Sequence, residues 1–286
     1  MPKASYHLIH PATRNTAVVF ASPHSGRDYS WSFMRRTVLD DHTIRSSEDA
    51  FVDRLFDSAP DHGAVFLKAG APRAFVDLNR AEDELDPALI EGVTLRSNNP
   101  RVATGLGVVP RVVANGRPIY HGKLKLDEAQ HRIATYWRPY HATLRRLMAE
   151  NHARFGRAIL VDCHSMPREA VAQLARTPSG RPDIVIGDRF GASSSSEIAD
   201  RIEAAFAYAG FNVARNSPFA GAYVLRQYGR PSKGHHAIQI EIDRSIYMNE
   251  AKLVPNANFG RIKSILGGII AEIADIGREG TSLAAE

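Results

Sequence analysis

One short stretch of the chain, Ala158–Ser165, constrains the fold more than any other. Its apolar first half stops abruptly at Asp162, Cys163 and His164. That pattern is typical of a buried β-strand that delivers polar side chains to the edge of a sheet. Because side chains alternate along a strand, Asp162 and His164 should point to one face and Cys163 to the other. His164 is then either a metal ligand or catalytic base, or a histidine buried in the core.

Composition argues against several classes of protein. The sequence has 286 residues and one cysteine, Cys163, which rules out an intrachain disulfide and a cysteine-rich zinc site. Its first residues lack the apolar core of a signal peptide, and no apolar run reaches the roughly 18 residues of a membrane helix. The net charge is +5, but Arg and Lys are interleaved with acids. We therefore expect a cytoplasmic protein that binds neither membranes nor nucleic acid, with local Arg serving a small anionic ligand.

Strands and helices alternate along most of the chain, which predicts an α/β sheet with helices on both faces. We expect strands over residues 16–22, 63–69, 73–78, 158–165, 183–187, 211–215 and 236–242. We expect helices within 35–47 and over 50–59, 126–155, 198–209 and 256–276, with a kink or break near Pro139 in the third. Residues 81–119 are rich in Pro, Gly and Asn, which predicts a loop. A loop of this length in a compact domain is usually functional. No internal repeat or linker stands out, so a single domain over 1–286 is expected.

Polar residues follow several of the predicted strands. His24, His164 and Glu241 all lie at or just beyond strand ends, where open α/β sheets bind their ligands. Two imidazoles could serve a catalytic zinc site, which needs about three protein ligands and an open position for water. The nearby acids that could complete the site are Glu48, Asp49 and Asp53. The alternative is that His24 caps a turn and that these acids stabilise a helix N-terminus.

A second group of residues suits an anionic ligand. Asn79 and Arg80 place an amide beside a guanidinium, and Arg73 lies shortly upstream. An arginine can grip a carboxylate with two parallel hydrogen bonds. Arg226 is a further candidate, in a segment expected to be a loop. The alternative is a structural ion pair between Asp77 and one of these arginines.

Taken together, several motifs resemble those of the N-formylglutamate amidohydrolase family. They occur in the family's order from about residue 16 to 250, which covers most of the chain. The motifs are Ser22–Arg27, Phe75–Arg80, Asp162–Ser165, Gly221–Tyr223, Arg226–Pro231, His236–Glu241 and Arg244–Met248. The segment Asp77–Arg80 also resembles an element of aspartoacylases and zinc carboxypeptidases.

The resemblance implies a fold and an activity. The expected fold is a three-layer α/β/α arrangement around a central mixed sheet, of the phosphorylase/hydrolase-like type that zinc carboxypeptidases share. The expected activity is hydrolysis of a linear amide with one zinc ion. The family's reaction converts N-formyl-L-glutamate to formate and L-glutamate in histidine degradation. The resemblance leaves the oligomeric state open.

The resemblance also implies a metal site and a catalytic base. By position, His24, Asp49 and His164 would bind the zinc ion, with Glu48 the close rival of Asp49. Wider relatives instead carry a glutamate three residues after the first histidine, where this chain has Arg27. Glu241 would be the general base.

Substrate binding would fall to the arginines and their neighbours. Arg73 would polarise the scissile carbonyl or help to hold the anion. Asn79 and Arg80 would bind the substrate carboxylate, assisted by Arg226 and Tyr223.

Three alternatives stay open at this point. The chain could act on another N-acyl amino acid or a small peptide, or it could be a binding protein that kept the fold and lost the chemistry. A metal-independent hydrolase would use Cys163 or Ser165 as nucleophile. Asp162 would support His164 only if its carboxylate reaches the imidazole ring.

Overall fold

The computed structural model describes residues 1–94, 99–176 and 180–278. The chain packs as two compact units, and each is assembled from three separate stretches. The first unit contains Met1–His7, Pro23–Glu48 and Lys68–Leu144. The second unit contains Leu8–Ser22, Asp49–Leu67 and Arg145–Glu286. Because the units interleave along the sequence, they are not two consecutive domains, and the single-domain organisation stays a prediction.

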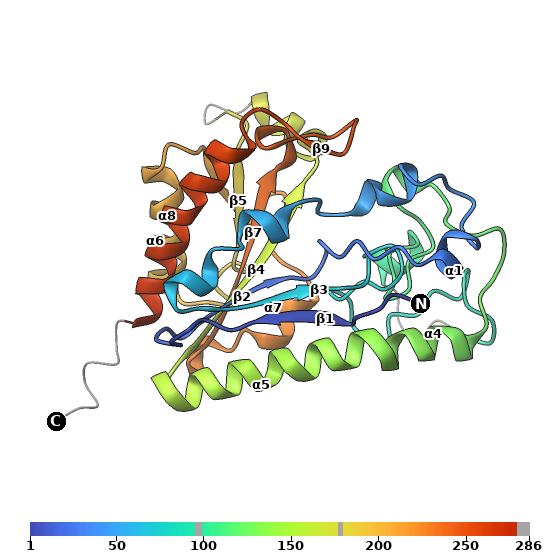
Figure 1. Cartoon of the computed structure of the whole chain (residues 1–286), viewed down its shortest axis with the longest axis horizontal. Helices are drawn as coiled ribbons and strands as arrows, with labels where there is room; N and C mark the ends of the chain where they lie inside the picture. The colour runs from blue at the N-terminus through green and yellow to red at the C-terminus, as the bar shows by residue number, and fades with distance from the viewer. Residues whose placement is uncertain (95–98, 177–179, 279–286) are drawn as a thin grey trace. The chain divides into compact units, whose positions relative to one another are not determined.

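A seven-stranded sheet, in the order β1-β3-β2-β4-β7-β5-β6, forms the framework (Figure 1). Strands β2, β4 and β7 run parallel, whereas β5 runs antiparallel to β7 and pairs in parallel with β6. The strands are β1 (Tyr6–Ile9), β2 (Val18–Ser22), β3 (Val65–Ala69), β4 (Ala158–Met166), β5 (Ile184–Gly187), β6 (Val213–Arg215) and β7 (His235–Asp243). The sheet is mixed and flanked by helices, which confirms the predicted α/β fold.

Helices of very different length connect these strands. The α-helices are α1 (Trp31–Met34), α2 (Val52–Leu55), α3 (Pro100–Ala103), α4 (Leu126–Arg132), α5 (Arg138–Phe155), α6 (Ser196–Tyr208), α7 (Tyr223–Tyr228) and α8 (Phe259–Arg278). The 3₁₀ turns are η1 (Thr43–Ser47), η2 (Ala59–His62), η3 (Ala114–Gly116), η5 (Arg168–Arg176), η6 (Pro231–Lys233) and η7 (Arg244–Ile246). A small hairpin pairs β8 (Met248–Asn249) with β9 (Val254–Pro255). Among the described residues, no helix is both long and apolar enough to cross a membrane.

The long helix predicted over 126–155 is interrupted as expected. The turn Ile133–Trp137 is π-helical and separates α4 from α5. Pro139 follows this turn and has no N–H to donate to the preceding turn, so the regular α-helical ladder cannot run through it.

One predicted strand and one predicted helix are wrong. Residues 73–78 form no strand, because the amides of Phe75 and Val76 donate to the Pro72 carbonyl and close a turn. The helix predicted over 50–59 shrinks to α2, since Phe51 adopts the left-handed conformation with φ 67° at its start. Apolar spacing alone does not reveal either backbone feature.

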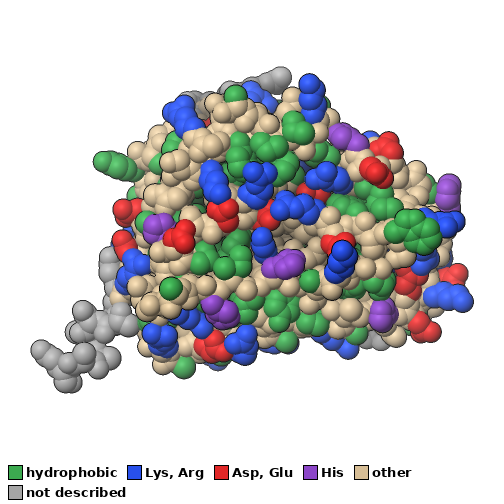
Figure 2. Space-filling model, in the orientation of Figure 1, with side chains coloured by type: hydrophobic (Ala, Val, Ile, Leu, Met, Phe, Trp, Pro, Cys, Tyr) green, Lys and Arg blue, Asp and Glu red, His purple; other side chains and the backbone are tan. Residues whose placement is uncertain are grey.

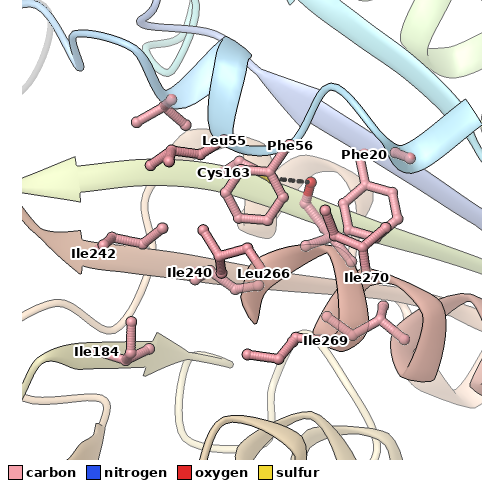
Figure 3. Close-up of a cluster of buried hydrophobic side chains, with 14 of the residues drawn as sticks. Phe20, Leu55, Phe56, Cys163, Ile184, Ile240, Ile242, Leu266, Ile269 and Ile270 are labelled. Atoms are coloured by element: carbon pink, nitrogen blue, oxygen red, sulfur yellow. Dashed lines mark hydrogen bonds between the residues drawn. The ribbon is translucent and has the colours of Figure 1, made fainter. Parts of the chain in front are cut away.

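The hydrophobic core of the second unit lies between the sheet and the helix pair α6 and α8 (Figures 1 and 3). Phe20 and Phe56 pack together with ring centroids 6.0 Å apart, and Ile240 and Leu266 belong to the same cluster. Cys163 is fully buried in this cluster. The predicted alternation along β4 is therefore confirmed, because Cys163 packs in the core while its neighbours in the sequence do not belong to it.

Candidate active site

Four polar side chains project from the centre of the sheet. Asp162 and His164 of β4 lie side by side with Gln239 and Glu241 of β7 in the parallel register. Paired residues of adjacent strands point to the same face, so all four share the face opposite Cys163. All four are at least nine-tenths buried. We call them the strand group.

Carboxylates hold both ring nitrogens of His164. Its Nε2 lies 2.9 Å from Asp162 Oδ2, and its Nδ1 lies 2.9 Å from Asp49 Oδ2. Burial alone would lower the pKa of His164, but Asp162, Asp49 and Glu241 raise that pKa well above its usual value. Asp162 therefore reaches the ring, as the sequence analysis required for a supporting role.

Asp49, rather than Glu48, faces His164. The Glu48 carboxylate accepts hydrogen bonds from Arg45 Nε at 2.9 Å and from the Tyr29 hydroxyl at 3.2 Å. The second oxygen of Asp49, Oδ1, accepts from Arg244 Nη2 at 2.9 Å. Neighbouring acids in the sequence thus have separate partners.

Glu241 is oriented by its neighbour on the same strand. Gln239 Nε2 donates to Glu241 Oε1 at 2.8 Å. Glu241 is 9% exposed, and His164 is its partner in the register of β4 and β7. A buried, oriented carboxylate beside a histidine can accept and return a proton.

A second cluster is built on the turn that replaces the predicted strand. Asp77 Oδ1 lies 2.7 Å from His24 Nε2 and accepts the Asn79 backbone amide at 2.8 Å. Asp77 Oδ2 accepts from Arg73 Nε at 3.0 Å. Burial raises the pKa of Asp77, but His24 and Arg73 outweigh burial and hold it well below its usual value. The ion pair between Asp77 and an arginine, raised above as an alternative, is therefore present.

Arg80 is anchored to backbone carbonyls of its own unit. Its Nε donates to the Leu106 carbonyl at 2.9 Å and its Nη1 to the Asn79 carbonyl at 3.1 Å. Asn79 and Arg80 are both buried. We call Arg73, Asp77, Asn79 and Arg80 the turn group.

Arg226 and Tyr223 lie on α7, so Arg226 sits on a helix and not on the predicted loop. The Arg226 guanidinium lies over the Tyr223 ring, 5.8 Å from its centroid. On the face that Figure 2 draws, basic and acidic side chains are interspersed.

The three residues expected to bind metal fit a divalent ion. His24, Asp49 and His164 are buried, and each offers a ligand atom within 4.8 Å of the other two. In both histidines Nε2 faces an aspartate outside this group, Asp77 or Asp162, so Nδ1 is the nitrogen that a metal would take. Two imidazoles and a carboxylate form a donor set that suits zinc.

Sequence reasoning missed three participants. Gln239 and Arg244 stand in the quoted motifs but had no role, and Asp77 was considered only as a partner for arginine. The spacing of Gln239 and Glu241, two apart on one strand, was a usable signal. Nothing local indicated that Arg244 reaches Asp49, 195 residues away.

Comparisons with known proteins identify the family of the chain. The model of the N-formylglutamate amidohydrolase family matches residues 16–248. An N-formylglutamate deformylase of Pseudomonas aeruginosa is 33% identical over 245 residues, covering 84% of this chain and 80% of that protein. A deformylase of the same name from Pseudomonas putida is 31% identical over 239 residues, covering 82% and 83%.

Solved structures give the same result. The crystal structure of N-formylglutamate amidohydrolase from Ralstonia eutropha superimposes with a TM-score of 0.90 at 34% identity, covering 96% of this chain and 99% of that one. A protein from Agrobacterium tumefaciens, 18% identical, shares the fold with a TM-score of 0.61 over 94% and 96% of the two chains. The chain belongs to the N-formylglutamate amidohydrolase family.

Proposed function

We propose that this protein hydrolyses N-formyl-L-glutamate to formate and L-glutamate with one zinc ion. The observation that carries the proposal is the buried group His24, Asp49 and His164, with Glu241 beside His164 in the strand register. The names of the two Pseudomonas relatives support the substrate. Histidine degradation, to which the family's reaction belongs, is the proposed context.

The metal would be held by one nitrogen from each histidine and one oxygen of Asp49. Zinc in this position lowers the pKa of a water molecule and polarises the scissile carbonyl. Asp77 and Asp162 would fix the two imidazoles through Nε2, which orients the rings and strengthens them as ligands. Asp49 is the better candidate than Glu48, whose carboxylate is bound by Arg45.

Glu241 would move the proton. Its carboxylate takes a proton from the attacking water as the water oxygen bonds to the formyl carbon. The same carboxylate then gives that proton to the nitrogen of glutamate as the carbon–nitrogen bond breaks. Gln239 donates to Oε1 and so would orient this carboxylate.

The arginines would bind and polarise the substrate. Arg73, fixed through Nε by Asp77, would face the oxygen that becomes negative during the reaction, where a fixed positive charge stabilises most. Asn79 and Arg80 would hold a carboxylate of the glutamate part. Arg226 and Tyr223, stacked on α7, would hold the other carboxylate.

A non-catalytic binding protein explains the site less well. A protein that only binds needs no base beside its metal ligands, yet Glu241 is buried and oriented there. Another N-acyl amino acid is the competing substrate. The described contacts define the groups around the scissile amide better than the groups that would bind the side chain of the substrate.

A substrate screen tests both points. The zinc-loaded protein is incubated with N-formyl and N-acetyl derivatives of glutamate, aspartate, glutamine and leucine, and the released amine is measured. We expect the highest kcat/KM with N-formyl-L-glutamate, and turnover lower by about 10²–10⁴-fold in the Glu241→Gln control. A higher kcat/KM on another derivative would reassign the substrate. Stoichiometric zinc without any turnover would reject the enzyme.

A further inference from the structure

The motif Arg244–Met248 has no part in the proposed reaction, although it lies directly after β7. Arg244 begins the 3₁₀ turn η7, and Tyr247 follows that turn. Both side chains are buried, Arg244 to 6% exposure and Tyr247 completely. A buried guanidinium is costly unless its partners repay the lost hydration, so its contacts indicate what it is there to hold.

Arg244 links the end of β4 to Asp49. Its Nη2 donates to Asp49 Oδ1 at 2.9 Å, and its Nε donates to the Ser165 hydroxyl at 3.1 Å. Ser165 comes directly after His164 on β4. One guanidinium therefore ties Asp49 to the residue next to His164.

Tyr247 holds the residue that follows Asp49. Its hydroxyl donates to the Ala50 carbonyl at 3.0 Å. The next residue, Phe51, has φ 67°, in the left-handed region that bulky residues rarely adopt. Such a conformation persists only where the surroundings fix it. Arg244 and Tyr247 supply two of these fixing contacts, one to the side chain of Asp49 and one to the adjacent backbone.

We propose that Arg244 and Tyr247 form a clamp that positions Asp49 to bind metal through a single oxygen. Asp49 Oδ1 is engaged by Arg244, whereas Oδ2 faces His164 Nδ1 at 2.9 Å. Oδ2 is therefore the metal-binding atom. The guanidinium also offsets the charge of the buried carboxylate. The clamp rests on the proposed function, because it needs a metal at His24, Asp49 and His164.

Zinc affinity of the full-length protein is the primary test, measured by competition with a chromophoric chelator. Arg244→Met should weaken zinc binding by about 10–100-fold, the usual loss when the partner of a metal ligand is removed. Tyr247→Phe should weaken it less, because Asp49 keeps Arg244. In an Asp49→Ala background, Arg244→Met should cost no further affinity. The visible spectrum of the cobalt-substituted protein should change in Arg244→Met, since Asp49 would coordinate differently.

Arg215→Met is the matched control. Arg215 Nη2 holds the buried Asp188 at 2.6 Å, the same chemistry in the same unit. Asp188 is not part of the metal-binding group. Arg215→Met should lower the melting temperature and leave zinc affinity and the cobalt spectrum unchanged.

The possible results distinguish a failure of the clamp proposal from a failure of the proposed reaction. Zinc binding by Arg244→Met that equals the wild type would overturn the clamp and leave the proposed reaction intact. A wild-type protein without stoichiometric zinc would overturn both. If Arg244→Met does not fold, Arg244→Lys and Tyr247→Phe decide, and wild-type affinity in both would overturn the clamp.

Discussion

The strand group and the turn group each hold a histidine in place with an aspartate, but they do so on different backbones. The aspartate oxygen lies 2.9 Å from Nε2 of the histidine for Asp162 and His164, and 2.7 Å for Asp77 and His24. In the strand group, the β4–β7 ladder fixes the backbone, so Asp162 has only to orient its histidine. In the turn group no strand exists, and Asp77 binds His24, Arg73 and the Asn79 amide together.

This difference has a physical lesson. Where a ladder of backbone hydrogen bonds supplies rigidity, each side chain can have a single task. Where the backbone is a turn, one buried carboxylate must organise both the backbone and its neighbours. A change at Asp77 should therefore disturb more functions than the same change at Asp162.

The largest expected effect concerns the strand group. Glu241→Gln removes the proposed base but keeps the shape of the side chain and an oxygen that can accept from Gln239. We expect kcat to fall by about 10²–10⁴-fold, the usual contribution of a general base. Zinc content should be unchanged, as measured by elemental analysis.

Glu197→Gln is the matched control for Glu241→Gln. It makes the same change on the exposed first turn of α6, and its kcat should equal the wild-type value. Near-full turnover in Glu241→Gln would show that Glu241 is not the general base. The strand group would then serve only to support the metal.

The next effect compares the two aspartates directly. Asp162→Asn and Asp77→Asn should each weaken zinc binding by about 10–100-fold, because each histidine loses its carboxylate partner. Asp77→Asn should in addition raise KM, since Arg73 loses the carboxylate that holds it. Zinc affinity and steady-state kinetics at saturating zinc separate the two effects. Equal KM values in the two variants would mean that Asp77 does no more than Asp162.

Sequence reasoning succeeded for the backbone of the strand group and failed for the backbone of the turn group, because only the first follows a local rule. Alternation along β4 and β7 is a local rule, so it gave the shared face of Asp162 and His164 and the buried position of Cys163. Residues 73–78 were predicted as a strand from their apolar and β-branched composition. Their hydrogen bonds go instead to Pro72 and, for Asp77, to the Val108 carbonyl. No pattern within the segment encodes a partner 31 residues away.

Partners elsewhere in the chain determine the features that the sequence leaves open. The choice of Asp49 over Glu48 depends on Arg45 and Arg244, which lie on opposite sides of these acids in the sequence. The residue before the left-handed Phe51 is held by Tyr247, which is also distant in the sequence. The family resemblance supplied the proposed metal-binding positions, whereas the supporting contacts required the three-dimensional structure.

The smallest expected effect tests the alternation itself. Cys163 lies between Asp162 and His164 but points into the core, and burial, together with Asp162, raises the pKa of its thiol well above the usual value. The thiol therefore stays protonated at the pH of the reaction, and only the thiolate is a good nucleophile. Cys163→Ala should keep kcat within about twofold and cost roughly 1 kcal/mol of stability, a typical value for a small core change. Thermal melts and kinetics measure both. Abolished turnover with zinc retained would place the thiol on the reactive face, and the strand register that unites Asp162, His164 and Glu241 would then be wrong.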